Sequence, residues 1–542
     1  MLRIAAISTF FLIALYSQSD IYFSPTFDVD AARTGMETIS RTDLEAHLTF
    51  LASDVTEGRA TGETGLAIAG EYIASHFRRV GLTPLLSNNS YFQRYELIKT
   101  KLSNKNQLTL LLDYGSSSLK ENFQYEEDFF VSPRGLSGSI EIQAPVVYAG
   151  YGISSKEYNY NDYAGISVNN CIVLIIDGEP DLDNPNRFNG SFDTRFSDLR
   201  EKLDQAKKNG ASAVLIATNP KSDELFTDKQ KRWKKWLHRE SMSLPTSDDI
   251  VPVITISETT ADRILSATGK TLRDLQIELE SEGKSNGRSI SNSYIRLNIN
   301  LIKESIISNN IVGYLPGTDP FIGHETVVIS AHYDHVGKNT KGEIYYGADD
   351  NASGTSALME IAEAITKNTT PSKRGFLFLA VSGEEKGLLG SKHYVKKPLL
   401  PLSNTVADLN IDMIGRNAPD SVYIIGSNMI SQDLHEINEY AANQIENLYL
   451  NYRFNSKNDP QRFYYRSDHY NFAQFGIPII FYFAGVHEDY HKPTDTIEKI
   501  NFQKLEKVSR LIYLTGWSVA NNETKLRKNA GELPMLPDQI KH

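Results

Sequence analysis

The stretch "GFLFLAVSGEEKGLLGS" (375–391) joins a buried-strand pattern to two adjacent acids. Its apolar run has the length and composition of a strand that is buried on both faces, and the run ends near Gly383. Glu384 and Glu385 follow at once. Neighbouring carboxylates at the end of a buried strand repel each other and lose hydration, so they need a positive partner. The stretch therefore predicts a buried strand that delivers two acids to a cationic site.

The same arrangement recurs along the rest of the chain after residue 303. Strand patterns alternate there with helix patterns, which favours an α/β fold with a mainly parallel, mixed sheet covered by helices on both faces. Side chains that follow parallel strands meet at one edge of such a sheet. The acids and imidazoles at these positions are His332, Asp334 and His335 in "HYDHVG" (332–337), Asp349 and Asp350 in "GADDNASG" (347–354), Asp412 after "TVADLNI" (405–411), and His487 and His491 in "HEDYHKPTDT" (487–496).

Imidazoles and carboxylates together are the donors that zinc or another borderline divalent metal prefers. Two histidines with three or four carboxylates exceed one tetrahedral site, but they suit two metals bridged by a carboxylate. Two adjacent acids would then divide the work: one binds metal, and the other accepts a proton from an activated water.

These motifs, in this order, resemble the secreted co-catalytic zinc exopeptidases, the family of bacterial leucyl aminopeptidases and glutamate carboxypeptidase. The residues that carry the resemblance are "VVISAHYDHVG", "GADDNASGTSALME", "SGEEKGLLGS", "LNIDMIGR" and "DYHKPTDT", with "HLTFLASD…EGRATG" and "NNIVGYLPGTDP" elsewhere in the chain. The segment 135–302, with short apolar strands between Gly, Asn and Asp turns, resembles the protease-associated (PA) domain that many members carry as an insertion.

The resemblance implies a role for each matching residue. Two zinc ions are expected. His332, Asp350 and Asp412 would hold one of them, and Asp350, Glu385 and His491 the other, with Asp350 as the bridge. The other implied roles are Glu384 as general base and later acid, Asp334 as an acceptor that braces the far nitrogen of His332, Tyr490 as a group that steadies the tetrahedral oxyanion, and a cis peptide bond between Asp350 and Asn351.

Several other polar residues near the motifs are better explained by structure than by chemistry. A satisfied or surface histidine is the expectation for His335, His393, His469 and His487. Asp349 is expected to shape its loop, and Asp468 is either a helix cap or an outer support of the metal site. Tyr490 has a second interpretation as a packing residue.

The 542 residues are expected to divide into four segments. Arg3 followed by an apolar run, Ile4 to Tyr16, and small residues near Ser19 is typical of a secretory signal, with an uncleaved anchor as the alternative. The expected segments are 1–19 as signal peptide, 36–134 as the N-terminal part of the peptidase domain, 135–302 as the PA-like domain, and 303–525 as the catalytic domain.

Charge and cysteine usage restrict the partners. The formal net charge of −11 argues against nucleic acid. Beyond the N-terminus no run approaches membrane-spanning length, so no stable membrane insertion is expected after signal cleavage. Cys171 is the single cysteine, which excludes an intramolecular disulfide. The expected location is secreted or periplasmic, with peptides or proteins as substrates, and the sequence leaves the oligomeric state open.

The function that these expectations support is a secreted exopeptidase that uses an activated water, most readily an aminopeptidase. A carboxypeptidase of the same family remains open, because Arg462 and Arg466 could bind a terminal carboxylate. The weaker alternatives are a glutaminyl cyclase-like enzyme with one zinc, a non-catalytic binding protein of the same fold, and a hydrolase with a single metal.

Overall fold

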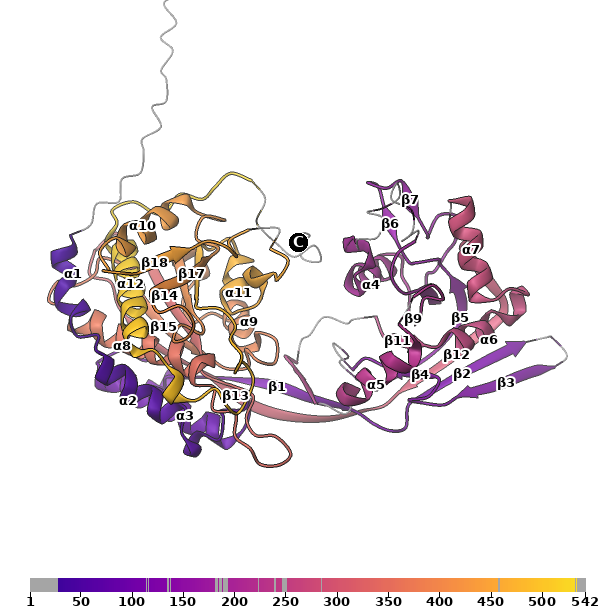
Figure 1. Ribbon diagram of the computed structural model, residues 1–542, viewed down its shortest axis with the longest axis horizontal. Helices are drawn as coiled ribbons and strands as arrows, with labels where there is room; N and C mark the ends of the chain where they lie inside the picture. Colours follow the sequence, from indigo (N-terminus) through magenta and orange to yellow (C-terminus); the bar gives the residue numbers. More distant parts are fainter. Residues whose placement is uncertain are drawn as a thin grey trace, which may run out of the picture.

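The computed structural model describes residues 28–533, except for 114, 116, 134–135, 137, 181–183, 185–187, 189–193, 223, 238–239, 246–250, 284, 457–458 and 532. The expected signal peptide lies outside the described residues. The described chain forms two lobes, a larger one and a smaller one, which are joined by long strands (Figure 1).

A nine-stranded mixed sheet forms the centre of the larger lobe. Its four central strands run parallel to one another, and antiparallel pairs flank them on both sides. This confirms the expected fold class: the strands that carry the motifs form the main parallel part, and the two strands at one edge of the sheet are also parallel to each other. In spatial order the strands are β10 (Ser241–Ser243), β1 (Phe92–Leu102), β13 (Leu301–Leu315), β15 (Gly375–Val381), β14 (Thr326–His332), β16 (Thr405–Ile411), β19 (Ile479–Phe483), β17 (Ser421–Ile425) and β18 (Tyr449–Asn451).

Helices cover both faces of this sheet, which is why its central strands are buried along their whole length. In β14, Val327 and Ile329 pack into one apolar cluster, and Val328 packs into another on the opposite face. One cluster contains residues of α1 (Val29–Met36), α2 (Arg41–Leu51), α3 (Thr64–Arg79), α8 (Gly354–Lys367), α10 (Gln432–Ala442) and α12 (Phe502–Asn521). The other contains residues of α9 (Leu389–Lys396) and α11 (His469–Ala473).

Side-chain caps fix where several of these helices begin. The hydroxyl of Ser40 accepts the backbone N–H of Asp43 at the start of α2, and Asn501 accepts that of Lys504 at the start of α12. Among the described residues, no helix combines the length and apolar character that a membrane crossing needs.

An eight-stranded sheet forms the centre of the smaller lobe. In spatial order its strands are β3 (Ser118–Phe123), β2 (Gln107–Asp113), β12 (Arg288–Ile299), β5 (Ile140–Tyr148), β8 (Ile172–Ile176), β9 (Ala213–Ala217), β11 (Val253–Ile256) and β4 (Phe129–Val131). The lobe also contains helices α4 (Leu199–Lys208), α5 (Phe226–Leu237), α6 (Glu258–Leu265) and α7 (Leu272–Glu282), and a separate pair of short strands, β6 (Ser154–Ser155) and β7 (Tyr160–Asn161).

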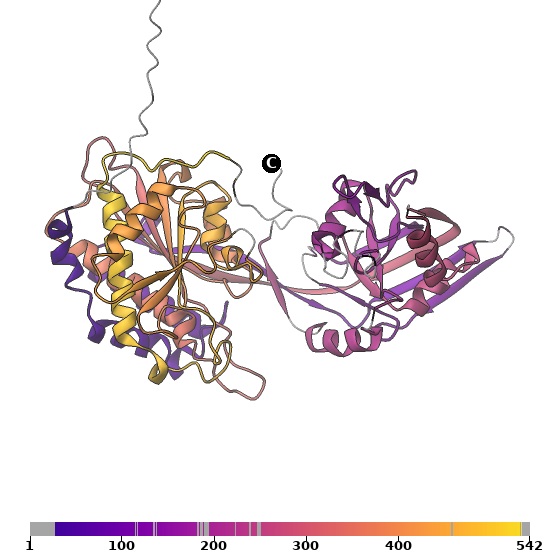
Figure 2. The same cartoon turned by 45° about the horizontal axis from the view of Figure 1, so that its top comes forward.

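Two paired stretches of chain cross between the lobes (Figures 1 and 2), and β10, which lies in sequence between α5 and β11 of the smaller lobe, also joins the larger sheet beside β1. Strand β1 leads into β2, and β12 leads into β13 after one residue, Asn300. The two stretches remain paired where they cross: Leu102 lies opposite Leu301, and the backbone N–H of Ser103 donates to Asn300 at 2.8 Å. Strands β2, β3 and β4 precede residue 135 in sequence but belong to the smaller sheet. The sheet of the smaller lobe thus begins earlier in the sequence than expected, at Gln107. The limits 135 and 302 of the inserted domain remain a prediction.

A buried histidine joins α3 to α8 in the larger lobe. The Nε2–H of His76 donates to the main-chain oxygen of Met359 at 2.9 Å, and its Nδ1 accepts from Arg79 at 3.2 Å. The neutral ring thus uses both of its nitrogens in hydrogen bonds. A second proton, on Nδ1, would be unfavourable because it would face the positive guanidinium of Arg79. Burial, with a contribution from His47, lowers the pKa of His76 to about 4.

This lowered pKa predicts a loss of stability in mild acid. The unfolded chain binds a proton at His76 near pH 6.5, whereas the folded chain binds it only near pH 4. The contribution of His76 to the free energy of unfolding is therefore complete above pH 6.5. About 1–3 kcal/mol of it is lost as the pH falls towards 4. We expect the urea midpoint of the wild type to fall more steeply over this range than that of His76→Gln, with chelator present in all samples. The same substitution at the exposed His324 is the control, and equal slopes for all three proteins would contradict the expectation.

Candidate metal centre

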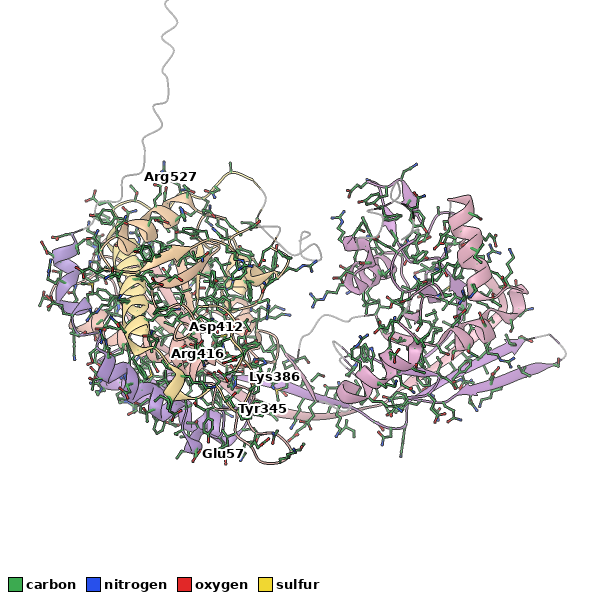
Figure 3. All side chains as sticks on the ribbon, viewed as in Figure 1. Glu57, Tyr345, Lys386, Asp412, Arg416 and Arg527 are labelled. Carbon is green, nitrogen blue, oxygen red and sulfur yellow. The ribbon has the colours of Figure 1, made fainter. Side chains whose placement is uncertain are left out.

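The four central strands end at the same edge of the larger sheet, and α8 begins there. The predicted ligands lie just beyond the strand ends and just before the start of α8. Figure 3 shows Asp412 inside the larger lobe. The peptide bond between Asp350 and Asn351 is cis, as the resemblance implied. The predicted ligands are placed as follows: His332 closes β14, Glu385 follows β15, Asp412 directly follows β16, His491 lies in the loop beyond β19, and Asp350 lies in the turn Ala348–Ser353 that precedes α8.

Two groups of side chains in the described part of the chain could hold a metal ion, and they share one aspartate. In the first group, the Nε2 atom of His332 lies 3.3 Å from Oδ1 of Asp412 and 3.4 Å from Oδ1 of Asp350. In the second, the Nε2 atom of His491 lies 3.1 Å from Oδ2 of Asp350 and 3.1 Å from Oε2 of Glu385. Asp350 thus offers one carboxylate oxygen to each group, which is the arrangement of a bridging ligand.

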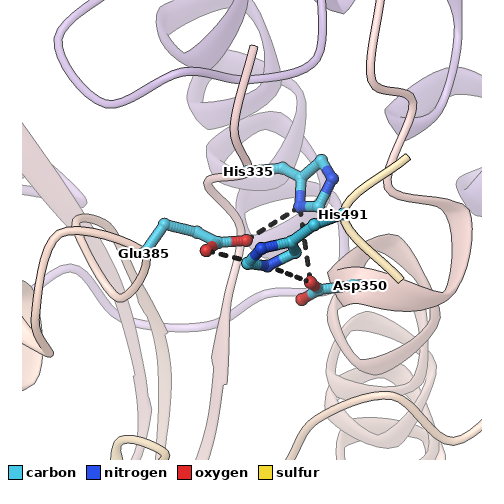
Figure 4. Close-up of side chains that lie close together, drawn as sticks. All are labelled: His335, Asp350, Glu385 and His491. Carbon is cyan, nitrogen blue, oxygen red and sulfur yellow. Dashed lines mark ion pairs between the residues drawn. The ribbon is translucent and has the colours of Figure 1, made fainter. Parts of the chain in front are cut away.

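The second group contains a residue that the sequence interpretation set aside. The Nδ1 atom of His335 lies 2.9 Å from Oε1 of Glu385 and 3.6 Å from Oδ2 of Asp350 (Figure 4). Its position in "HYDHVG", in the loop that follows β14, was the available signal. The other three histidines set aside, His393, His469 and His487, belong to neither group.

The donor atoms of both groups fit a divalent metal. Within the described chain, the inward-facing atoms of these residues are buried and have no hydrogen-bond partner. Buried polar atoms that approach charged neighbours without forming a hydrogen bond need an explanation. A cation held by imidazole nitrogens and carboxylate oxygens would satisfy all of them. The atoms are Nε2 of His332, Nε2 of His491, Oδ2 of Asp350, Oε1 of Glu385 and Oδ1 of Asp412.

The charges within this centre act strongly on one another. Burial opposes the ionisation of Glu385, but the imidazoles of His335 and His491 outweigh burial and hold the pKa of Glu385 well below its usual range. The carboxylates of Asp350 and Glu385 raise the pKa of His491 to about 10 against the effect of burial. At neutral pH the ring of His491 therefore carries a proton on each nitrogen. A metal ion would have to displace one of these protons, because only a neutral imidazole can bind a metal.

Glu384 differs from its neighbour in position and in protonation. It belongs to neither metal group, although it is adjacent in sequence to Glu385. Burial and the nearby carboxylates raise its pKa well above the usual range, despite the opposing charge of His332. A carboxyl group with a raised pKa beside a metal group is suited to accept a proton and to return it.

Asp334 holds Glu384 in place and does not make the bond that was expected. Its carboxylate accepts the backbone N–H of Glu384 at 3.2 Å and the hydroxyl of Thr61 at 2.9 Å. The Nδ1 atom of His332 is 3.1 Å from the main-chain oxygen of Asp334, whereas the carboxylate is 3.9 Å away. The ring of His332 is therefore oriented by the backbone of the same loop.

Arg59 is fully buried and connects the loops that carry the ligands. Its guanidinium donates to four main-chain oxygens: those of Tyr333 at 2.9 Å, Tyr346 at 2.8 Å and Gly347 at 2.8 Å, and that of Leu51. Burial lowers its pKa to about 10, although Asp350 and other carboxylates of the centre oppose this. The positive charge thus stabilises the acids without occupying a ligand oxygen.

A second layer of contacts supports the turn that contains Asp350. Asp495 accepts the backbone N–H groups of Asp349 and Asp350, both within 3.2 Å. Asp349 itself accepts the N–H of Gly415 at 2.6 Å and lies 3.3 Å from Nε2 of His487. These contacts agree with the expectation that Asp349 shapes its loop.

The two residues with open roles are placed differently. The ring of Tyr490 stacks on His491, with centroids 3.9 Å apart, and burial beside the acids raises its pKa. Asp468 forms no side-chain cap on α11. Its carboxylate accepts a hydrogen bond from the hydroxyl of Ser391, and burial raises its pKa to about 7.

The neighbouring residue, Ser467, supports Asp412. Its hydroxyl donates to Oδ2 of Asp412 at 2.7 Å, which leaves Oδ1 free for a metal.

Comparison with known proteins agrees with this geometry. Residues 310–515 match peptidase family M28, and residues 142–264 match the PA domain. Aminopeptidase YwaD of Bacillus subtilis (strain 168) is 30% identical over 228 residues, which are 40% of this chain and 46% of that protein. A probable leucine aminopeptidase of Trichophyton verrucosum (strain HKI 0517) is 29% identical over 223 residues, which are 40% of this chain and 58% of that protein. The matches thus span about half the length of these curated relatives.

A solved structure extends the similarity of fold to almost the whole chain. The aminopeptidase from Aneurinibacillus sp. strain AM-1 superposes with a TM-score of 0.51 at 19% sequence identity, over 93% of this chain and 97% of that one. Residues 310–515 thus form a segment of the peptidase family M28 type, and a PA domain, residues 142–264, precedes it in the chain.

Proposed function

We propose that this chain is a zinc-dependent exopeptidase with two metal ions, and that it acts as an aminopeptidase. The observation that carries the proposal is the carboxylate of Asp350, whose two oxygens face two separate groups of donors. A single-metal hydrolase or a one-zinc cyclase would leave one of these groups without a role. Since no predicted ligand is missing from either group, a purely binding role is disfavoured.

The residues of the first group would be His332, Asp350 and Asp412, and those of the second Asp350, Glu385 and His491. When bound, the metals would polarise the scissile carbonyl and make a water molecule more acidic. Glu384 takes the proton of that water and then delivers it to the nitrogen of the leaving amine. Asp334 keeps Glu384 in position through its backbone, and Tyr490 remains a proposed contact to the oxyanion.

The carboxylates of the site favour an aminopeptidase over a carboxypeptidase. Arg416 pairs with Asp489 at 2.8 Å and Arg462 lies 4.0 Å from Asp198 of the smaller lobe, while Arg466 lies over the ring of Phe463. Arg416 is therefore occupied by Asp489, whereas Arg462 and Arg466 are exposed with weak contacts, so the carboxypeptidase remains the alternative. A free α-amine, by contrast, suits a site that is rich in carboxylates.

The expected export of the protein also belongs to this proposal. It is based on Arg3 and the apolar run from Ile4 to Tyr16, which lie outside the described residues. Expression of the full chain in a bacterial host should give an exported form whose N-terminus lies near residue 20, as Edman sequencing would show. A protein that keeps Met1 and stays with the membrane would instead support an uncleaved anchor.

The division of labour between the paired glutamates gives a first test. Glu384→Gln should keep two metals per chain and lower turnover by about 100-fold or more, because an amide accepts no proton. Glu385→Gln should weaken metal binding at least about tenfold, because it removes a ligand. Metal content after gel filtration and turnover would be measured for both variants and the wild type. Full wild-type activity at one metal per chain would contradict the two-metal centre, and metal loss from Glu384→Gln alone would reverse the two roles.

The choice of chain end can be tested with one short peptide in three forms. We expect hydrolysis of the unblocked peptide and of the form with an amidated C-terminus, because only the free α-amine is recognised. Acetylation of the N-terminus should abolish cleavage. Chromatography of the products would identify the released residue, and chelator-treated enzyme is the control. The opposite pattern would indicate a carboxypeptidase with the same metal chemistry.

A further inference from the structure

His335 is placed like a ligand of the second metal group. It is fully buried, and its Nδ1 atom faces the same point as Nε2 of His491 and the carboxylates of Asp350 and Glu385 (Figure 4). The four donor atoms all lie within 4.8 Å of one another. Its closest approaches, 2.9 Å to Glu385 and 3.6 Å to Asp350, bracket the spacing of about 3.3 Å between neighbouring ligands of a tetrahedral zinc.

The orientation of the ring argues against an ordinary hydrogen bond. Within the described chain, neither nitrogen of His335 has a hydrogen-bond partner, even though Nδ1 is only 2.9 Å from Oε1 of Glu385. The Nε2 atom of His491 shows the same combination of a short approach and no hydrogen bond. Atoms that approach closely without pointing at one another are converging on a common point between them, as donors around a cation do.

The backbone around His335 is built to accommodate this ring. Its N–H donates to the main-chain oxygen of Arg59 at 3.0 Å, which fixes the loop directly after β14. A Cβ atom on Gly347 would lie 2.2 Å from the main-chain oxygen of Asp350 and 2.6 Å from the imidazole ring of His335. Gly347 also adopts a positive φ of 56°, so a larger residue would be strained at this position as well as blocked by the ring.

We propose that Nδ1 of His335 binds the same metal ion as Asp350, Glu385 and His491. This inference rests on the proposed two-metal function. It gives the second group four protein ligands, two of them nitrogens, while the group of His332 keeps three. Four protein ligands are typical of zinc sites that hold the metal firmly, and three leave a position for water or substrate. The two sites therefore differ in their affinity for zinc and in their role. The four-ligand site binds the first zinc ion, and the three-ligand site offers the open position for water or substrate.

Two near-isosteric substitutions distinguish a ligand from a hydrogen-bond donor. His335→Asp places a carboxylate oxygen close to where Nδ1 stands, so it can bind metal but cannot donate to Glu385. His335→Asn places an amide N–H there, so it can donate but is a poor zinc ligand. His393→Gln is the matched control, since His393 lies outside both groups and stacks on Tyr95.

The experiment titrates the full-length, metal-free chain with Zn²⁺ against a chromophoric chelator and needs no substrate. For the wild type and His393→Gln we expect two dissociation constants at least about tenfold apart. His335→Asn should weaken the tighter one by about 100-fold or more, because loss of a direct ligand should exceed the 10- to 100-fold effect of losing an outer contact. His335→Asp should recover a large part of that affinity.

A second readout follows coordination directly. With one equivalent of Co²⁺, the visible bands of the wild type should be those of a four-coordinate site, and they should weaken in His335→Asn. If His335→Asn keeps the wild-type zinc affinity and cobalt spectrum while His335→Asp loses them, His335 only donates to Glu385 and the proposal is overturned. Equal affinities at both sites of the wild type would also overturn it. Absence of peptide hydrolysis by a protein that binds two metals in this manner would overturn the proposed function and leave this assignment standing.

Discussion

The guanidinium of Arg59 and the carboxylates around Asp350 form the electrostatic arrangement on which the site depends. Ionised side chains buried without compensation are strongly destabilising, and this sheet edge gathers several of them. Arg59 binds main-chain oxygens of the ligand loops, so its charge acts on Asp350 and Glu385 while their oxygens stay free. A lysine could not make the same set of contacts, because four acceptors around one side chain require the planar fork of arginine.

The parallel centre of the larger sheet determines which residues meet at this edge. Strands β14, β15, β16 and β19 end side by side, and each sends one or more donors into the loop that follows. Burial on both faces leaves these strands little freedom, so the donors are positioned by rigid elements, while the loops supply only the last few ångströms. The backbone bonds of Asp334 and Asp495 then orient the loops themselves.

The sequence was sufficient to predict the parallel strands and the meeting of His332, Asp350, Glu385, Asp412 and His491 at one edge, because strand ends in such a sheet converge. Their roles as metal ligands remain a proposal. It was insufficient wherever the direction of a loop decides the contact. His335 turns back towards Glu385, and Asp334 uses its carboxylate on Glu384 while its main chain approaches His332. The pairing of β2 with β12 joins residues more than 180 positions apart, so the composition of residues 107–113 alone could not place them in the smaller sheet.

The same long-range pairing fixes how the smaller lobe is attached. Strand β13 pairs with β1 from Leu301 to Ile311 and with β15, the strand that precedes Glu384, from Ile311 to Leu315. A lobe carried on two paired strands has less freedom than one joined by a flexible linker, because bending it would disturb backbone hydrogen bonds. The smaller lobe is therefore attached, through β1 and β13, directly to the part of the sheet that positions the proposed metal ligands.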